Sequence, residues 1–387
     1  MLTIHKCRVV LGGILVLFLL GISQTGCQEV EGAIQFHDGV DRTGAYQTKG
    51  VPVLNGLLWK FMTSGEVWSS PILADGIIYI GSDDMTFYAV DAQTGQEKWR
   101  YKTGGNIRSA AAVYDGRVYF TSFDGSLYAL DAKTGKLSWQ LDMQEGVLIS
   151  RQQYDDFTSS PLIVDDSLFV GSLNPRKGFF AVNAKTGKVI WNYKTSTAET
   201  FNSSAAYANG LVYFGGWNAL YALDAKTGKE EFRIKIGQTA NYSTAIFKGL
   251  VYFSSKDTNL YAINASNGDV VWKTKLSGSS WVTSSPAIAE GMVYAGTSDG
   301  HKLFAVAVDT GEIKWKFKAN GYVWSSPVFA DGIVYFGSVD KKLYAVDALT
   351  GDEKWEYEMD GGITSSPLVK DGVVYVGSRD GYLYAIH

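Results

Sequence analysis

Hydrophobic and polar positions along this chain follow a pattern that repeats about every 40 residues. Its clearest copy is Tyr128–Trp139 (YALDAKTGKLSW), where an alternating apolar stretch, a polar run ending in Thr-Gly and a second alternating stretch follow one another. Alternation with a period of two is typical of strands, and a Gly-containing polar run between two strands predicts a tight turn. The other complete copies are Tyr88–Trp99, Phe180–Trp191, Tyr221–Phe232, Tyr261–Trp272, Phe304–Trp315 and Tyr344–Trp355.

Two further strands are expected before each of these hairpins. In the second unit they fall at Arg108–Val113 and Arg117–Ser122, and the hairpin follows at Leu127–Trp139. Asp-Gly pairs such as Asp115-Gly116 predict two-residue turns that need positive φ angles. Within the hairpin, we expect Asp131 to accept backbone N–H groups and Gly135 to adopt a conformation that is costly for other residues. Because these residues recur in every unit, their role is predicted to be structural.

The two ends of the repeat region complete one another. Leu57–Phe61 (LLWKF) matches the second half of the hairpin, whereas Gly381–His387 (GYLYAIH) matches the first half and then stops. Joined, the two halves make an eighth copy, so the repeat is expected to close into a ring. The sequence therefore predicts an all-β fold over residues 57–387: an eight-bladed β-propeller of four-stranded blades, with the last blade closed by the N-terminal strand.

The first residues indicate a targeting segment. Lys6 and Arg8 precede Val9–Ile22, an apolar or glycine run of 14 residues that suits a secretory signal better than a membrane span. The run leads to the sequence QTGC, which resembles a lipobox with Cys27 as the lipidated residue. Cleavage near Gly26 without lipidation is the alternative. We expect a signal peptide at 1–26, a tether and an ordered arm at 27–56, and a membrane link through the lipid anchor only.

The cysteine count and the net charge exclude some further properties of the protein. Once the signal is removed, Cys27 is the only cysteine, so no internal disulfide is expected. The formal net charge is −4, and the chain has no basic run or RNA-binding motif, so a nucleic-acid partner is not expected. The 43 glycines and 14% aromatic residues agree with a strand-rich chain whose turns are built mainly with Gly.

The combined pattern, S-S-P-x-x-x-x-D-G-x-V-Y-x-G-S followed by Y-A-L-D-A-x-T-G-x-x-x-W, resembles the PQQ-like β-propeller repeat across about Leu57–His387. Phe36–Gly44 (FHDGVDRTG) is similar to the segment that leads into such propellers. That family includes quinoprotein dehydrogenases and non-enzymatic outer-membrane assembly lipoproteins of the BamB type. Eight repeats, the overall length and a lipobox-like Cys27 favour the second group.

The resemblance to the dehydrogenases implies features that this sequence lacks. Those enzymes carry a vicinal pair of cysteines over the quinone and a calcium site beside a catalytic Asp, and here no two cysteines are adjacent. The four histidines are dispersed and do not indicate a metal site. They are His5, His37, His301 and His387. No catalytic residue, metal or PQQ cofactor is therefore expected.

The remaining tryptophans point to a candidate site. Seven of the eleven close the repeat and are expected to be core. Trp68 and Trp324 instead stand immediately before the Ser-Ser-Pro segment of their units. When the corresponding segments of the other units are aligned, the same position, here called the slot, is held by Arg108, Asn202 and Tyr242. The other members of the predicted rim at the channel mouth lie two residues upstream of that slot or in a turn between the second and third strands. They are Asp156, Trp281, Tyr322 and Trp217.

Two interpretations of this rim stay open. It is either a binding surface for sugars, planar ligands or an extended peptide, or a set of aromatic residues that plug the axis. One interval between units is longer than the others, and its extra residues at Asp142–Phe157 and Ser172–Gly178 are expected on the same face, as a candidate partner contact.

Three functions are consistent with these features. The first is a non-catalytic scaffold on the periplasmic or cell-surface side of a membrane, which binds an envelope protein or peptide, including outer-membrane assembly machinery. The second is a surface propeller that binds a glycan or planar small ligand. The third, a PQQ-dependent dehydrogenase, would need a convergent acid/base or metal set, which the sequence does not offer.

Overall fold

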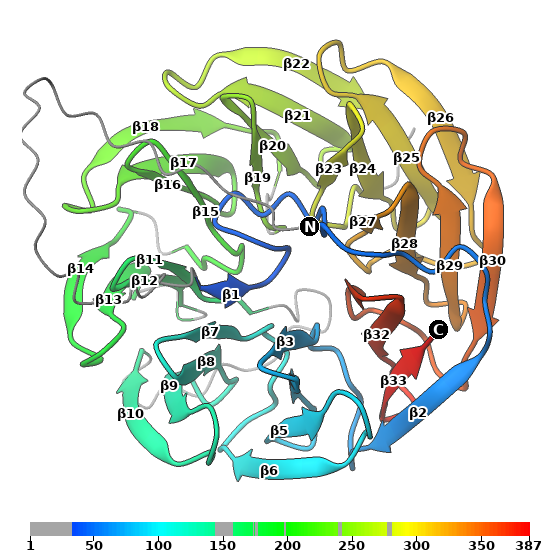
Figure 1. The fold of residues 1–387 in the computed structure, drawn as a ribbon. Helices are drawn as coiled ribbons and strands as arrows, with labels where there is room; N and C mark the ends of the chain where they lie inside the picture. Colours follow the sequence, from blue (N-terminus) through cyan, green and yellow to red (C-terminus); the bar gives the residue numbers. More distant parts are fainter. Residues whose placement is uncertain are drawn as a thin grey trace, which may run out of the picture. The chain divides into compact units, whose positions relative to one another are not determined.

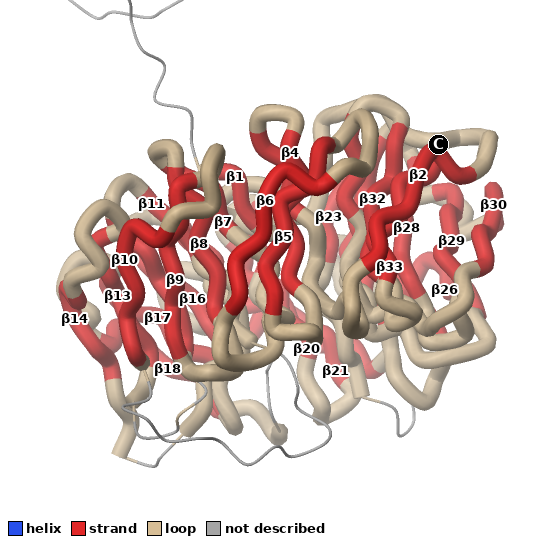
Figure 2. Tube along the Cα trace, turned by 90° about the horizontal axis from the view of Figure 1, so that it is seen from below, coloured by secondary structure: helices blue, strands red, loops and turns tan. Residues whose placement is uncertain are grey.

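The computed structural model describes residues 33–143, 158–172, 174, 177–196, 199–238, 242–276 and 281–387. Their regular structure is all strand, and nowhere in these ranges is there a helix with the length and apolar character needed to cross a bilayer. Eight antiparallel sheets stand around one axis, one for each blade (Figure 1). Seven of them have four strands, and the sheet of the second blade has β1 as a fifth. Seen from the side, the strands run between the two ends of the ring (Figure 2). The predicted eight-bladed propeller is confirmed.

In each blade the first strand is short and the outer three are longer. The first four blades consist of β3 (Ile72–Ala74), β4 (Ile77–Gly81), β5 (Thr86–Asp91) and β6 (Glu97–Lys102); β7 (Ala112–Tyr114), β8 (Arg117–Thr121), β9 (Ser126–Asp131) and β10 (Leu137–Asp142); β11 (Leu162–Val164), β12 (Ser167–Gly171), β13 (Phe179–Asn183) and β14 (Val189–Tyr193); β15 (Ala206–Ala208), β16 (Leu211–Gly215), β17 (Ala219–Asp224) and β18 (Glu230–Lys235).

The other four continue in the same order. They consist of β19 (Ala245–Phe247), β20 (Leu250–Ser254), β21 (Asn259–Asn264) and β22 (Val270–Lys275); β23 (Ala287–Ala289), β24 (Met292–Gly296), β25 (Lys302–Ala307) and β26 (Ile313–Lys318); β27 (Val328–Ala330), β28 (Ile333–Gly337), β29 (Lys342–Asp347) and β30 (Glu353–Glu358); β31 (Leu368–Lys370), β32 (Val373–Gly377), β33 (Tyr382–Ile386) and β2 (Leu57–Met62).

The eighth blade joins the two ends of the repeat region. β2 pairs antiparallel with β33, with Trp59 opposite Ala385 and Met62 opposite Tyr382. The sheet order is β2-β33-β32-β31, so the N-terminal strand supplies the outermost position. The predicted ring closure is confirmed.

Local turn chemistry explains the repeat. Asp115 and Gly116 have φ angles of 49° and 70°, as a two-residue hairpin turn with positive φ requires. In the longer turn, Oδ1 of Asp131 accepts the backbone N–H of Thr134 at 2.8 Å and its hydroxyl at 2.7 Å. Gly135 follows with φ 69°. The structural role predicted for these residues is confirmed.

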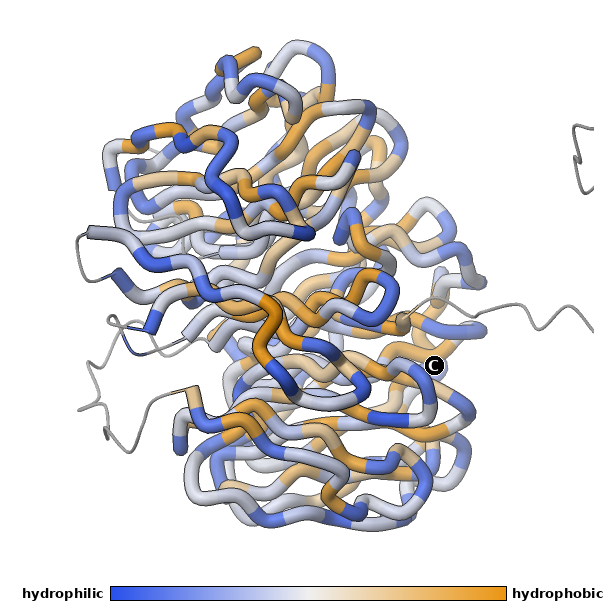
Figure 3. The backbone as a smooth tube through the Cα atoms, turned by 90° about the vertical axis from the view of Figure 1, so that its left-hand side faces the viewer, coloured by the Kyte–Doolittle hydropathy of each residue, from blue (hydrophilic) through white to orange (hydrophobic). Residues whose placement is uncertain are grey.

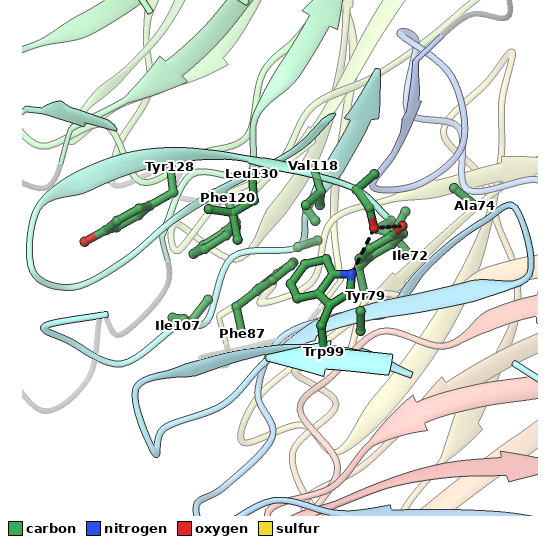
Figure 4. Close-up of a cluster of buried hydrophobic side chains, with 14 of the residues drawn as sticks. Ile72, Ala74, Tyr79, Phe87, Trp99, Ile107, Val118, Phe120, Tyr128 and Leu130 are labelled. Atoms are coloured by element: carbon green, nitrogen blue, oxygen red, sulfur yellow. Dashed lines mark hydrogen bonds between the residues drawn. The ribbon is translucent and has the colours of Figure 1, made fainter. Parts of the chain in front are cut away.

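In seven of the eight blades the hairpin ends with a tryptophan, and six of these bond their blade to the next one; the fourth blade has Phe232 there. Figure 4 shows Trp99 of the first blade, whose indole N–H donates to the carbonyl of Ala132 in the second blade at 3.0 Å. The Tyr79 hydroxyl donates to the same oxygen at 2.9 Å. Equivalent bonds join Trp59 to Ala92, Trp139 to Ala184, Trp191 to Ala225, Trp272 to Val308 and Trp315 to Ala348.

At the junction between the seventh and eighth blades the acceptor comes from the N-terminal arm. Trp355 donates to the carbonyl of Val51 at 2.6 Å. The arm also bonds to the end of the last strand, because Asn55 and Gly56 both donate backbone N–H groups to the carbonyl of His387. The arm therefore takes the place of the turn that the eighth repeat lacks.

The arm also closes one end of the axis. β1 (Ile34–Gln35) pairs with β7, and the next residues curl past the first strands of successive blades. Their carbonyls accept backbone N–H groups at 2.7–2.8 Å: Val40 from Tyr207, Asp41 from Ile246, Thr43 from Ile288 and Gly44 from Phe329. This tight course is visible in blue near the centre of Figure 1. The hydrophobic colour in Figure 3 follows the strands and the hydrophilic colour gathers at the turns, as expected for a core that lies between blades.

The glycine after the hairpin Thr has a second constraint besides its φ angle. A Cβ at Gly135 would lie 2.6 Å from the Trp99 ring, whereas a Cβ at Gly116, with nearly the same φ, would meet nothing within 4 Å. We expect Gly116→Ala to lower the free energy of unfolding by about 1 kcal/mol through backbone strain, and Gly135→Ala by about 3 kcal/mol because ring displacement is added. Urea unfolding of both variants measures the difference. Equal losses would contradict the packing role.

Candidate functional site at the axial mouth

A buried arginine anchors the floor of the axis. Arg42 is 0% exposed, and its guanidinium donates to the carbonyls of Phe36 at 3.0 Å, Pro161 at 3.0 Å and Ser160 at 3.2 Å, and also to that of Ala205. Burial lowers the pKa of Arg42 to about 9, so the group still carries its charge at neutral pH. It binds the arm to the first strands of the third and fourth blades.

His37 lies beside this arginine. Its ring stacks on Phe36 with a centroid distance of 4.1 Å, and neither ring nitrogen has a hydrogen-bond partner among the described residues. Burial, with a smaller effect from the Arg42 charge, lowers the pKa of His37 to about 3. The imidazole is therefore neutral and contributes packing rather than charge to the floor.

Above the floor lies an axial cavity of about 60 Å³. Serine hydroxyls surround it, and most accept a backbone N–H from the preceding blade, so they join blades as well as line the axis. The donor and acceptor pairs are Ala110 and Ser160, Ser160 and Ser204, Ser243 and Ser285, Ser285 and Ser326, Ser326 and Ser366, and Ser366 and Ser70. The mouth is formed by Trp68, Arg108, Thr158, Asn202, Tyr242, Trp324 and Thr364.

Two guanidinium groups lie over the indole of Trp68. The Cζ of Arg108 is 4.2 Å and that of Arg379 is 4.8 Å from the ring centroid. Arg108 forms a two-point ion pair with Asp83, Nε to Oδ1 at 2.8 Å and Nη2 to Oδ2 at 2.5 Å. Glu66 accepts from both Trp68 and Arg379, at 2.6 and 2.9 Å. The positive charges beside Trp68 are therefore compensated.

A second aromatic group stands on the seventh blade. Tyr322 stacks on Trp324 with ring centroids 5.2 Å apart and an interplanar angle of 27°. His301 of the sixth blade meets the edge of Tyr322 at 5.3 Å. Trp324 lines the cavity, so the group presents an apolar surface to the mouth.

The structure brings five of the predicted rim residues to the cavity: Trp68, Arg108, Asn202, Tyr242 and Trp324. Trp281 is exposed and has the Lys256 ammonium 4.8 Å from its ring centroid. Trp217 is 57% exposed in the turn between β16 and β17. Neither of these two lines the cavity. Cys27, Asp156 and all of the predicted loop after Met143 lie outside the described residues.

The alignment of Tyr242 with Trp68 is wrong by one position. Ser243 donates its N–H to a serine hydroxyl as Ser285 does, and the Tyr242 carbonyl accepts from Ser203 as the Ser109 carbonyl accepts from Ser69. Tyr242 therefore stands where other blades carry the first serine, one position after the position that Trp68 holds in its blade. The fifth blade has no Ser-Ser-Pro segment, so its register is visible only from the start of β19.

Two threonines at the mouth were aligned with Trp68 from the sequence but were not named as site residues. Thr158 and Thr364 occupy the same slot as Trp68, and their hydroxyls are buried without a partner among the described residues. Threonine is common in strands, so its type alone does not indicate a binding site. The only indication in the sequence was that both threonines align with Trp68.

The cavity does not fit a quinone cofactor. Pockets for drug-sized ligands measure roughly 300–1,000 Å³, whereas this one is about 60 Å³. Across the described parts of the chain, no group of three or more His, Cys, Asp or Glu side chains is placed to hold a metal ion. The described lining of the cavity consists mainly of aromatic side chains and hydroxyls.

The fold and the axial mouth define a class of protein: an eight-bladed propeller of PQQ-like repeats whose axis is closed at one end by its own N-terminal arm. A family model described as "Outer membrane protein assembly factor BamB" matches residues 54–205, 181–245, 239–323 and 320–387. The chain belongs to this family.

The individual relatives include both assembly factors and an enzyme. Outer membrane protein assembly factor BamB of Yersinia pestis is 28% identical over 185 residues, which are 41% of this chain and 47% of the relative. The solved structure of BamB from Moraxella catarrhalis superposes with a TM-score of 0.70 at 19% identity, covering 87% of this chain and 98% of that one. The quinohemoprotein alcohol dehydrogenase of Comamonas testosteroni superposes with a TM-score of 0.77 at 17% identity, covering 90% and 79%.

The structural matches and the family model support different conclusions about this chain. At 17% and 19% identity, the structural matches establish the fold alone. The matched regions span 24% to 47% of the lengths of the first curated relatives. Family membership therefore comes from the model that covers the propeller, and the function needs its own argument.

Proposed function

We propose that this chain is a non-catalytic, exported propeller that acts as a BamB-like binding or assembly scaffold at the cell envelope, with a lipid anchor at Cys27. The observation that carries the proposal is the closed axis. The arm seals one end, and the space that remains above it is about 60 Å³. The chemistry left to the described surface is recognition of another molecule.

Family membership supports the same function. The matching model is described as an outer-membrane assembly factor, and a relative of that description aligns over 41% of this chain. A partner would find large, half-buried aromatic side chains at the mouth, and such residues dominate binding energy at protein interfaces. The partner class is an envelope protein or an extended peptide of the outer-membrane assembly machinery.

Capture of partners from detergent-solubilised membranes tests the proposal. We expect the lipidated full chain to recover envelope proteins, and Trp68→Ala/Trp324→Ala to reduce their affinity by about 2 kcal/mol or more for each indole. The matched control is Leu349→Ala, an exposed apolar residue in the turn after β29, which should leave capture unchanged. Partners recovered equally by the double variant would contradict a role for the rim.

The enzyme alternative has its own test. The purified chain is mixed with PQQ, calcium and a redox dye, and alcohols or sugars are added as substrates. We expect no dye reduction, because the cavity is too small for the quinone. Substrate-dependent reduction would overturn the non-catalytic assignment.

A second candidate function is favoured by a separate observation. Three residues that line the axial cavity each have a buried polar atom without a partner in the described protein, although buried polar groups are usually paired. Recognition of a glycan or another small ligand at the mouth would provide partners for them.

A further inference from the structure

We propose that the axial cavity is a subsite for one hydroxyl-bearing group of a neutral pyranose sugar, whose ring rests at the mouth against Trp324. This inference names a ligand class for the second candidate function and rests on that candidate. It is independent of the scaffold function, which concerns a protein partner.

Three buried polar atoms without a hydrogen-bond partner in the described part of the chain indicate what kind of group would bind. They are Oγ1 of Thr158, Oδ1 of Asn202 and Oγ1 of Thr364, on side chains 6%, 6% and 3% exposed. The three residues belong to the third, fourth and eighth blades, and all of them line the cavity. A threonine hydroxyl both donates and accepts, and an amide oxygen accepts. Such a set matches a ligand group that also donates and accepts, which is the property of a hydroxyl.

Charge excludes the main alternatives. The described lining residues include no Asp or Glu, so an ammonium group would be desolvated there without a counter-charge. A carboxylate would find only the Arg108 guanidinium, which Asp83 already engages at two points. A neutral group meets neither penalty, which favours a neutral sugar over an amino sugar, a uronate or a lysine side chain of a protein partner.

The volume of the cavity limits which part of the sugar can enter it. About 60 Å³ corresponds to roughly two water molecules, so a hydroxymethyl group can enter but a whole pyranose cannot. The ring then stays at the mouth, where Trp324 lines the cavity and is held from one side by Tyr322. Trp68 is less suited to stacking, because two guanidinium groups already lie over its ring.

Saturation-transfer NMR and calorimetry on the purified full chain test the inference, with glucose, mannose and N-acetylglucosamine as neutral probes. Glucosamine and glucuronate are the charged counterparts. We expect at least one neutral sugar to bind. Thr364→Val, which keeps the shape and removes the hydroxyl, should weaken it about fivefold, and Trp324→Ala more than about tenfold. Leu349→Ala removes an exposed apolar side chain that lies outside the rim and the cavity lining, and it should change nothing.

Several results would overturn the proposal. They are the absence of binding by all three neutral sugars, tighter binding of glucosamine or glucuronate than of glucose, and sugar binding that is unchanged in both Thr364→Val and Trp324→Ala. The thermal transition of each variant shows that it is folded. If sugars bind as expected and the full chain captures no envelope protein, the scaffold proposal fails and this one stands.

Discussion

Deletion of Tyr382–His387 is expected to unfold the whole ring rather than one blade. The deleted strand, β33, lies between β2 and β32 and contains Leu383, Tyr384, Ala385 and Ile386, all of them buried. Loss of their burial alone costs about 6 kcal/mol, a large part of the roughly 5–15 kcal/mol that stabilises a folded domain. β2 loses its only partner, and the ring opens where its two ends meet.

Circular dichroism and tryptophan fluorescence measure this result, because the indoles at the blade junctions report on every part of the ring. Removal of His387 alone is the control: β33 stays complete, and only the bonds between His387 and residues 55–56 are lost. We expect that variant to unfold close to the wild type. A truncated protein with seven intact blades and a purely local change would contradict the closed-ring account.

Arg42→Ala is expected to lower the free energy of unfolding by about 4 kcal/mol. The substitution removes the donor from four buried carbonyls and leaves a space at the floor of the axis. The arm should then detach more readily, so limited proteolysis at residues 33–56 should accelerate together with the loss of stability in urea unfolding.

Arg42→Lys keeps a positive charge but cannot reproduce the planar fork, so we expect a loss between the wild type and the alanine variant. Arg117→Ala is the surface control. It removes an exposed ion pair with Asp115 at 3.3 Å and should cost less than about 1 kcal/mol. An alanine variant at position 42 that is as stable as the surface control would show that the arm does not hold the axis closed.

Much of the fold could be predicted because its causes are local. The Asp-Gly turns and the positive φ at Gly135 follow from the residues themselves, and both were predicted correctly. Ring closure could also be predicted, since LLWKF and GYLYAIH are two halves of one repeat. The first strands were predicted too long: in the second blade the ladder begins at Ala112, not at Arg108. Arg108 and Ala110 line the axial cavity, and the backbone N–H of Ala110 bonds to the Ser160 hydroxyl of the next blade instead of to a strand.

The candidate site could be predicted only in part. Trp68 and Trp324 were found because they depart from the repeat, and both line the cavity. Tyr242 was placed one position away from its register, because the fifth blade carries no Ser-Ser-Pro to mark it. Thr158 and Thr364 were aligned with Trp68 but not chosen as site residues, since an unpaired hydroxyl is a property of the folded surroundings and not of the residue.

By itself, the sequence determined the strands, the turns, the number of blades and the way the ring closes. These depend on the period of the apolar pattern and on turn residues that act over a few positions. Only the tertiary structure decided that Val51 supplies the acceptor for Trp355, that Arg42 locks the arm across the axis, and that the axis retains a small neutral cavity. These features join atoms far apart in the chain, and no short-range pattern encodes which of them meet.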